Sequence, residues 1–339
     1  MKTADFDFEL PKNLIAQKPI KPRENCRLMI LNRQTGKISE DYFYNLPLFL
    51  KKGDVLVFND SKVIPARLIG KRVQTGGKIE ILLLRDCGKA GWEALISGHR
   101  RRVGQKIEFS KGLVGEIVKP EKEGKWQILF NLGGKKFQEI LFKIGKTPTP
   151  PYIKKMTPLP DYQTVYAKNL GSVAAPTAGF HFSKKLINKL KKQKIDFEFV
   201  TLHIGLGTFA PIRKKNIKNH YLHSEWANLS KEVARRLNKA KKNGQRIIVV
   251  GTTTARVLET AANQKNQLLP YSGQTQLFIF PCYKFKFIDS LITNFHLPKS
   301  SLLLLVSAFA GQELIKKTYQ LAIKKKYRFY SFGDAMFII

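Results

Sequence analysis

Two polar, glycine-containing segments hold residues suited to chemistry. AAPTAGFHF spans residues 174–182 and TLHIGLGTF spans residues 201–209, and each sets a histidine and threonine among glycines beside large apolar residues. Gly179, Gly205 and Gly207 let the backbone approach a ligand or adopt positive φ. Such segments on strand ends and loops are typical of the walls of a binding site. The alternative is a pair of tight turns with capping threonines.

A third candidate is RIIVVGTTTARVLE, residues 246–259, in which Gly251 and three threonines separate an apolar strand from a helix. Backbone N–H groups at a helix start favour an anion, and threonine hydroxyls add donors. The segment lacks the lysine of a P-loop and the paired glycines of a dinucleotide fingerprint. By itself it is also typical of an ordinary turn, but turns at the carboxyl edge of a parallel sheet bind ligands.

Histidines and carboxylates gather in two further segments. HYLHSE, residues 220–225, would place His223 and Glu225 on one face if it were a strand. A metal would need a third and fourth ligand, which no neighbouring Cys or Asp supplies, so acid/base or positioning roles are favoured over a metal, with surface hydrogen bonding as the alternative. In ITNFHLPKSSLLLLVSAFAG, residues 292–311, Asn294 and His296 alternate along an extended segment before a buried helix, although a structural histidine is equally compatible.

Asp334 and an arginine triplet complete the candidates. Asp334 follows a glycine inside an aromatic stretch, where an acid is either paired or functional. GHRRRVGQ, residues 98–105, contains Arg100, Arg101 and Arg102 beside a histidine, and this grouping suits phosphate contacts better than isolated solvated charges.

The elements that must position these residues fall into two kinds. Short apolar runs between residues 61 and 146, separated by glycine-rich breaks, predict a small β-barrel or sandwich. The rest predicts strands at 27–31, 53–60, 197–204, 246–251 and 277–280, and helices at 183–193, 230–243, 252–262 and 312–325. This alternation predicts an α/β fold with a largely parallel sheet covered by helices.

The first sixty residues are too few to form a stable domain by themselves. We therefore expect residues 1–60 and 151–339 to form one discontinuous α/β domain, with residues 61–150 inserted as a β-barrel domain; a three-domain chain is the alternative. The proline-dense segment at 147–155 marks the second boundary.

Composition points to a polyanionic partner. The 339 residues include 60 Lys and Arg against 25 Asp and Glu, a formal net charge of +35. Such a field attracts nucleic acid, although a lysine-rich genome is the plain alternative. The amino terminus carries acids rather than the apolar core of a signal peptide, and no run is long enough to span a bilayer. Three isolated cysteines, Cys26, Cys87 and Cys282, indicate neither disulfides nor a zinc site, so we expect a cytoplasmic protein.

Taken together, these segments resemble one family nearly end to end. The motifs, in order, are FDFELPKNLIAQKP, RENCRLMIL, GDVLVFNDSKVIPARL, GGKIEILLL, TPPYI, DYQTVYA, AAPTAGFHF, TLHIGLGTF, HSE, VGTTTARVLE, ITNFHLPKSSLLLLVSAFAG and YRFYSFGDAMF. They are similar to those of the S-adenosylmethionine:tRNA ribosyltransferase-isomerases of queuosine biosynthesis. Cys26, Phe180, Cys282 and Ser301 depart from the serine, leucine, glycine and threonine usual there. A side chain at position 282 could press on a close backbone approach.

The resemblance implies transfer and isomerisation of the ribosyl moiety of S-adenosylmethionine onto 7-aminomethyl-7-deazaguanine at the tRNA wobble position. The product is epoxyqueuosine-tRNA, and adenine and methionine are released. It also implies an α/β domain with an inserted barrel, S-adenosylmethionine as a consumed co-substrate and tRNA as partner. We expect no prosthetic group, metal or membrane association, and a monomer.

Against that chemistry we predict three groups of site residues. The acid/base candidates are His203 and Glu225 first, then His181, His223, His296 and Asp334. Substrate binding is expected from Thr177, Gly179, Gly205, Gly207, Thr208, Thr252, Thr253 and Asn294, with Thr252 and Thr253 suited to the methionine carboxylate. Contacts to tRNA are expected from Arg100, Arg101 and Arg102.

Two other functions compete with this one. An S-adenosylmethionine-dependent tRNA methyltransferase would keep adenine in its donor product, and the sequence lacks the early glycine-rich turn followed by a ribose-binding acid. A non-catalytic RNA-binding protein would bind tRNA tightly without consuming S-adenosylmethionine. Buried-looking polar segments disfavour a pure binder, which would carry its polar groups on open surface.

Overall fold

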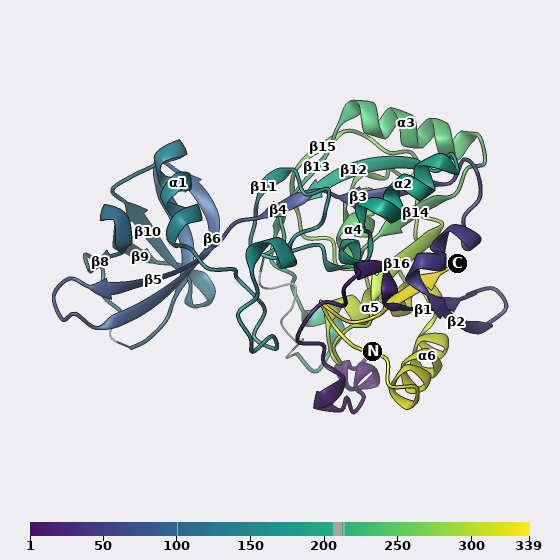
Figure 1. The fold of residues 1–339 in the computed structure, drawn as a ribbon, viewed down its shortest axis with the longest axis horizontal. Coiled ribbons are helices and arrows are strands. Elements are labelled where there is room, and N and C mark those ends of the chain that lie inside the picture. Colours follow the sequence, from purple (N-terminus) through teal and green to yellow (C-terminus); the bar gives the residue numbers. More distant parts are fainter. Residues whose placement is uncertain (100, 206–211, 213) are drawn as a thin grey trace.

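The computed structural model describes residues 1–99, 101–205, 212 and 214–339, which form two lobes (Figure 1). The smaller lobe is a closed antiparallel barrel in the strand order β10-β7-β6-β5-β8-β9. Its strands are β5 (Arg67–Arg72), β6 (Lys78–Gly88), β7 (Gly91–Ile96), β8 (Lys106–Glu108), β9 (Val114–Pro120) and β10 (Trp126–Phe130). Helix α1 (Gly134–Ile144) packs Phe137 and Leu141 into the barrel's own core.

The larger lobe is built on a nine-stranded sheet in the order β15-β13-β12-β3-β14-β16-β17-β1-β2. The strands are β1 (Arg27–Leu31), β2 (Ile38–Tyr42), β3 (Val55–Asn59), β12 (Asp196–Leu202), β13 (Glu225–Leu229), β14 (Ile247–Val250), β15 (Tyr271–Thr275), β16 (Ser290–Asn294) and β17 (Ala335–Ile338).

This sheet is mixed, so the expectation of a largely parallel sheet is only partly right. The central strands β12, β3, β14 and β16 run parallel, and β17 is parallel to β1. The other four pairings are antiparallel. The β1–β2 pair shows the reason, because its short turn at residues 32–37 permits only an antiparallel return.

Helices cover both faces of the sheet. One face packs against α3 (Lys231–Lys242), α4 (Thr252–Ala261), α5 (Ser301–Ala310) and α6 (Gln312–Lys324). The other packs against α2 (Lys184–Lys192) and the 3₁₀ turns Phe43–Phe49 and Thr177–His181. The helices predicted at 183–193, 230–243, 252–262 and 312–325 are therefore confirmed, and Ser183, Ser230 and Ser300 cap α2, α3 and α5.

The strand predicted at 277–280 is wrong, since those residues follow β15 without regular structure. The backbone groups of Leu277 bond to side chains instead. The Leu277 N–H donates to Thr275 Oγ1 at 3.2 Å, and the Leu277 carbonyl accepts from Arg256 Nε at 3.1 Å.

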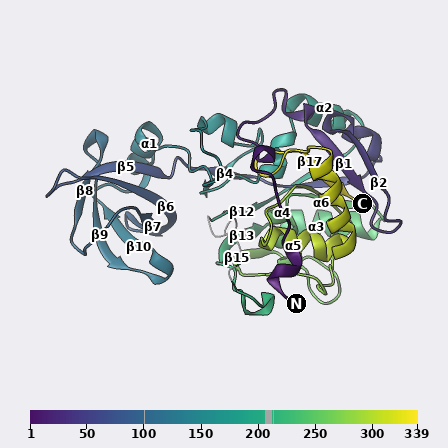
Figure 2. The same ribbon diagram turned by 90° about the horizontal axis from the view of Figure 1, so that it is seen from below.

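A short parallel pair, β4 (Ser61–Val63) with β11 (Asn169–Ser172), lies between the barrel and the large sheet and forms a neck (Figures 1 and 2). The barrel strands all fall within residues 67–130, and the large sheet draws on residues 27–59 and 196–338. The domain boundaries at 60/61 and 150/151 stay a prediction. In the part of the chain that is described, no helix combines the length and apolar character needed to cross a membrane.

Candidate functional site

A pocket lies at the carboxyl edge of the central strands, where β14 and β16 end. It holds about 600 Å³, part of it open to solvent. Its walls come from residues 175–178, 251–253, 293–297 and 330–331, with single residues from other segments, including Tyr152 and Ile204. The predicted site residues among these are Thr177, Thr252, Thr253, Asn294 and His296.

The start of α4 gives the pocket an anion-binding wall. Gly251 has φ +92° and donates its N–H to the Ile292 carbonyl at 2.8 Å, a conformation that favours glycine. The chain then turns into the helix at Thr252, so the first backbone N–H groups lie at the pocket. Asn59 at the end of β3 donates to Thr253 Oγ1 at 3.3 Å and orients that hydroxyl. This wall suits a carboxylate.

Asn294 is oriented by a buried chain of hydrogen bonds. Its Nδ2 donates to the Tyr330 carbonyl at 3.0 Å and lies 3.2 Å from His181 Nε2. Because that ring nitrogen accepts, the proton sits on His181 Nδ1, which is 3.0 Å from Cys26 Sγ. Burial lowers the pKa of His181 to about 3, so the ring is neutral at pH 7. His181 therefore acts on the pocket only through Asn294.

His296 lines the pocket directly. Its Nε2 lies 3.0 Å from Thr293 Oγ1, and its backbone N–H donates to the Tyr319 hydroxyl at 2.9 Å. Burial lowers the pKa of His296 to about 3. The pocket thus presents a neutral imidazole that can exchange hydrogen bonds with a ligand.

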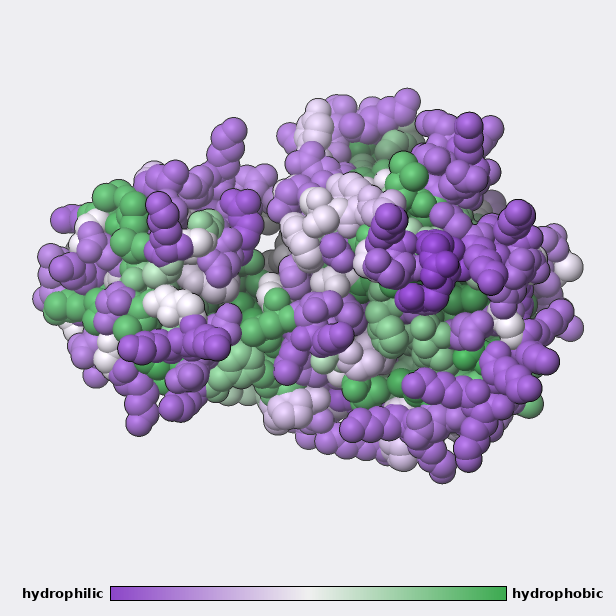
Figure 3. Space-filling view, turned by 90° about the horizontal axis from the view of Figure 1, so that it is seen from above, coloured by the Kyte–Doolittle hydropathy of each residue, from purple (hydrophilic) through white to green (hydrophobic). Residues whose placement is uncertain are grey.

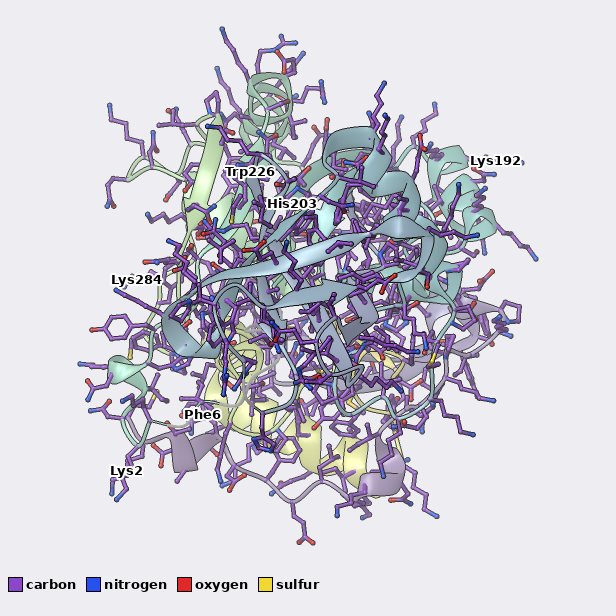
Figure 4. The ribbon with its side chains drawn as sticks, turned by 90° about the vertical axis from the view of Figure 1, so that its left-hand side faces the viewer. Lys2, Phe6, Lys192, His203, Trp226 and Lys284 are labelled. Atoms are coloured by element: carbon purple, nitrogen blue, oxygen red, sulfur yellow. The ribbon has the colours of Figure 1, made fainter. Side chains whose placement is uncertain are left out.

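His203 belongs to a second cluster on the same edge of the sheet. Its ring stacks on Trp226, with centroids 5.2 Å apart and planes 19° from parallel (Figure 4). Partial burial lowers the pKa of His203, and nearby Asp60 opposes that shift. Asp60, at the end of β3, accepts from Asn169 Nδ2 at 3.0 Å and from Thr201 Oγ1 at 2.7 Å.

Glu225 and His223 face different partners. Glu225 is buried, forms an ion pair with Arg256 of α4, and accepts the Gly205 N–H at 2.9 Å. His223 precedes β13 and lies 2.9 Å from Glu123 in the barrel lobe. The segment before Glu225 is not a strand, because β13 begins only at Glu225, so the condition for placing both side chains on one face is not met.

The other predicted residues that the structure describes do not line the pocket. Asp334 accepts backbone N–H groups from Arg27 at 3.0 Å and Arg328 at 2.7 Å, and desolvation raises its pKa. Gly179 packs in a turn where a Cβ would lie 1.9 Å from the Tyr166 hydroxyl. Arg101 and Arg102 are exposed on the barrel lobe. Arg100, Gly207 and Thr208 lie outside the described residues.

Sequence reasoning missed Asp60, which is the last residue of the strand predicted at 53–60, and Arg256, the partner of Glu225. A signal for Asp60 was present, because a carboxylate directly after a fully buried strand stands at the edge where ligands bind. Nothing in the sequence pairs Arg256 with Glu225. No group of three or more His, Cys, Asp or Glu side chains placed to hold a metal occurs in the ranges that the structure covers.

The fold and pocket define an α/β protein with a β-barrel beside its main sheet and a ligand site at the carboxyl edge of the parallel strands. Residues 3–338 match the family model described as "Queuosine biosynthesis protein", and the chain belongs to that family.

Its relatives match over their whole length. A protein of Caldanaerobacter subterraneus subsp. tengcongensis is 51% identical over 344 residues, and one of Clostridioides difficile is 49% identical over 341 residues; both alignments cover 100% of each chain. Both are named S-adenosylmethionine:tRNA ribosyltransferase-isomerase. The crystal structure of S-adenosylmethionine tRNA ribosyltransferase from Thermotoga maritima is similar at a TM-score of 0.58 and 36% identity, covering 99% of this chain and 100% of that one.

Proposed function

We propose that this protein transfers and isomerises the ribosyl moiety of S-adenosylmethionine onto 7-aminomethyl-7-deazaguanine at the wobble position of tRNA. The products are epoxyqueuosine-tRNA, adenine and methionine. The observation that carries this proposal is the full-length identity of 51% to a relative named for this activity. The proposed reaction consumes S-adenosylmethionine as a co-substrate and asks for acid/base groups and positioning rather than a redox centre.

The pocket supports a donor site for S-adenosylmethionine. In this proposal the methionine carboxylate binds the N–H groups and hydroxyls at Thr252 and Thr253, where the start of α4 favours negative charge. The 175–178 segment, including Thr177, packs against the nucleoside. Asn294 and His296 contact the ribose, whose carbon next to the sulfonium is acidic enough for a modest base.

The residues outside the pocket take supporting roles in the same proposal. Glu225 and its partner Arg256 fix Gly205, and His181 orients Asn294. Asp334 ties Arg27 to Arg328. The roles of Glu225, Arg256, His181 and Asp334 are positioning roles, because none of these four side chains lines the pocket.

The charge of the chain supports tRNA as the partner. The net charge of +35 favours a polyanion, and Arg101 and Arg102 are exposed on the barrel. Figure 3 shows hydrophilic side chains over much of both lobes on the face that it displays. We propose further that the protein works as a monomer and in the cytoplasm, where its tRNA substrate is present.

One assay tests the activity. The protein is incubated with S-adenosylmethionine labelled in the ribose and with tRNA carrying the 7-aminomethyl precursor. We expect free adenine and ribose label on the RNA in equal amounts. Adenine retained in the donor product would indicate a methyltransferase. Tight tRNA binding without consumption of S-adenosylmethionine would indicate a pure RNA-binding protein. Adenine release without RNA labelling would leave a nucleosidase.

A pair of asparagine variants tests the pocket in the same assay. Asn294→Ala removes an oriented amide from the pocket wall and should lower kcat by about 100-fold or more. Asn188→Ala, on the exposed surface of α2, is the matched control and should leave the rate unchanged. Equal rates for the two variants would exclude a role for this pocket in the reaction.

A further inference from the structure

Asp60 is a buried carboxylate whose hydrogen-bond donors are all neutral. Its residue is 8% exposed, at the point where the chain leaves β3 for the neck. Its side chain accepts from the Asn169 amide and from the Thr201 hydroxyl. Among the residues that the structure describes, no Lys, Arg or His forms an ion pair with it, whereas two other buried carboxylates, Asp54 and Glu225, each pair with an arginine.

A buried anion without a counter-charge is costly, so such groups are normally paired. A carboxylate has about four acceptor positions. Within the described residues, the Oδ2 atom of Asp60 accepts one hydrogen bond, which Asn169 shares between the two oxygens at 3.0 Å to each. The site therefore has both the charge and the acceptor capacity to receive a cationic N–H group.

Beside Asp60 lies the stacked pair of His203 and Trp226, both only partly buried. One ring nitrogen of His203, Nδ1, is buried without a hydrogen-bond partner in the described part of the chain, and Gly171 packs closely against the other side of the ring. Gly171, at φ +139°, faces the ring where a Cβ would lie 3.1 Å from Nε2 and Cε1, so any other residue there would crowd it.

This cluster adjoins the donor pocket. Asn59, next to Asp60, donates to Thr253 Oγ1 in the pocket, and Ile204, next to His203, is a pocket wall. The cluster also lies near the barrel, because His223, three residues before Trp226, contacts Glu123 of the barrel lobe. A ligand held here has its reactive group close to a donor bound in the pocket and its remainder between the two lobes.

We propose that Asp60, His203 and Trp226 form the acceptor site, which takes a planar nucleobase carrying an alkylammonium group. The base stacks on the Trp226–His203 pair, and the ammonium pairs with Asp60. This inference rests on the proposed function. A primary alkylamine is protonated at pH 7, as lysine is, and supplies the missing counter-charge. RNA-binding proteins commonly stack unpaired bases on such aromatic surfaces.

The charge contact is tested with two stem–loop RNAs that are identical except at the wobble position, where one carries 7-aminomethyl-7-deazaguanine and the other guanine. The wild-type protein should bind the aminomethyl RNA about 10-fold or more tightly than the guanine RNA. Asp60→Asn should abolish this preference and leave the Kd of the guanine RNA unchanged. Asp60→Glu should retain this preference in part. Asp161→Asn, in the 3₁₀ turn Leu159–Tyr162, should retain it fully.

The stacking contact is tested separately. Trp226→Ala should weaken the binding of both RNAs by about 5- to 100-fold, and Trp226→Phe should retain most of the wild-type affinity. The KM for S-adenosylmethionine should stay unchanged in both variants. Trp226 can also be isolated as the single tryptophan by replacing Trp92 and Trp126 with phenylalanine, and its fluorescence should then be quenched on titration with either RNA.

Three results would overturn the assignment. They are an intact preference in Asp60→Asn, a change in the KM for S-adenosylmethionine with unchanged RNA affinity, or no quenching of Trp226. Thermal melting of each variant separates loss of the fold from loss of the contact. If the wild-type protein releases no adenine, the proposed function itself fails. If the wild-type protein releases adenine and the Asp60 and Trp226 variants bind both RNAs as the wild type does, only the acceptor site fails.

Discussion

Cys282 is a residue whose type conflicts with its backbone. It follows Pro281 and adopts φ +81°, and the Tyr283 N–H donates to the Phe280 carbonyl at 3.0 Å. A proline followed by a residue with positive φ is the pattern of a type II turn, in which glycine is preferred at the third position. The resemblance already indicated that glycine is usual here, and the structure supplies the reason.

Cys282→Gly should therefore stabilise the protein. Relief of the left-handed strain outweighs the added freedom of the unfolded chain, and we expect a gain of about 0.5–1 kcal/mol and a Tm increase of about 1–2 °C. Thermal unfolding under reducing conditions measures it. Cys87→Gly is the control, since Cys87 is also exposed but lies within β6, where glycine costs stability. Equal shifts in both variants would refute the turn argument.

Single residues were predictable where type and local position suffice. Thr252, Thr253 and Asn294 follow apolar strands, and strand ends at one edge meet in space. The partners of Glu225 and His181 could not be predicted. Arg256 and Cys26 come from distant segments, and nothing in the local sequence links them to Glu225 and His181. The neutral state of His181 depends on burial, which only the tertiary packing sets.

At the scale of elements, one buried ion pair ties three segments together. Arg256 on α4 pairs with Glu225 at the start of β13, and Glu225 in turn holds the Gly205 N–H after β12. Both side chains are only 4% exposed, so the pair makes the position of α4 depend on that of the β12–β13 edge.

Removing one member should be far more costly than removing an exposed pair. Arg256→Met leaves the Glu225 carboxylate buried and should lower the free energy of unfolding by about 3–5 kcal/mol. Adding Glu225→Gln to that variant should recover part of the loss. Arg236→Met is the control, because its side chain is 51% exposed beside Glu198 and its loss should cost at most about 1 kcal/mol. Urea unfolding compares them, and similar costs would contradict the argument.

The helices were largely predictable, whereas five strands of the large sheet and the strand pairing were not. Serine caps and apolar periodicity located α2 and α3 within one or two residues, and α6 begins at the predicted residue. Pairing direction depends on connections: β13 and β15 meet antiparallel at the sheet edge although two helices and a strand separate them in sequence. At 277–280 the apolar run suggested a strand, but the Leu277 N–H and carbonyl bond to side chains instead.

On the scale of the whole molecule, the charge of +35 governs the encounter with RNA. Binding of tRNA should weaken steeply with salt because phosphate contacts release counterions. Arg102→Ala should lower the slope of log K against log salt by about 1 if Arg102 contacts a phosphate. Arg85, which is exposed on the same lobe but paired with Glu93, is the matched control and should change the slope less. Filter binding at several KCl concentrations measures both slopes, and an unchanged slope in Arg102→Ala would remove this residue from the interface.

The neck has a mechanical consequence. The chain departs toward the barrel directly after Asp60, and on its return Asn169 donates to the Asp60 carboxylate. The segments that lead to and from the barrel are thus joined at one side chain. A bulky substrate that displaces the barrel would strain the Asn169–Asp60 hydrogen bonds together with the His223–Glu123 contact between the lobes.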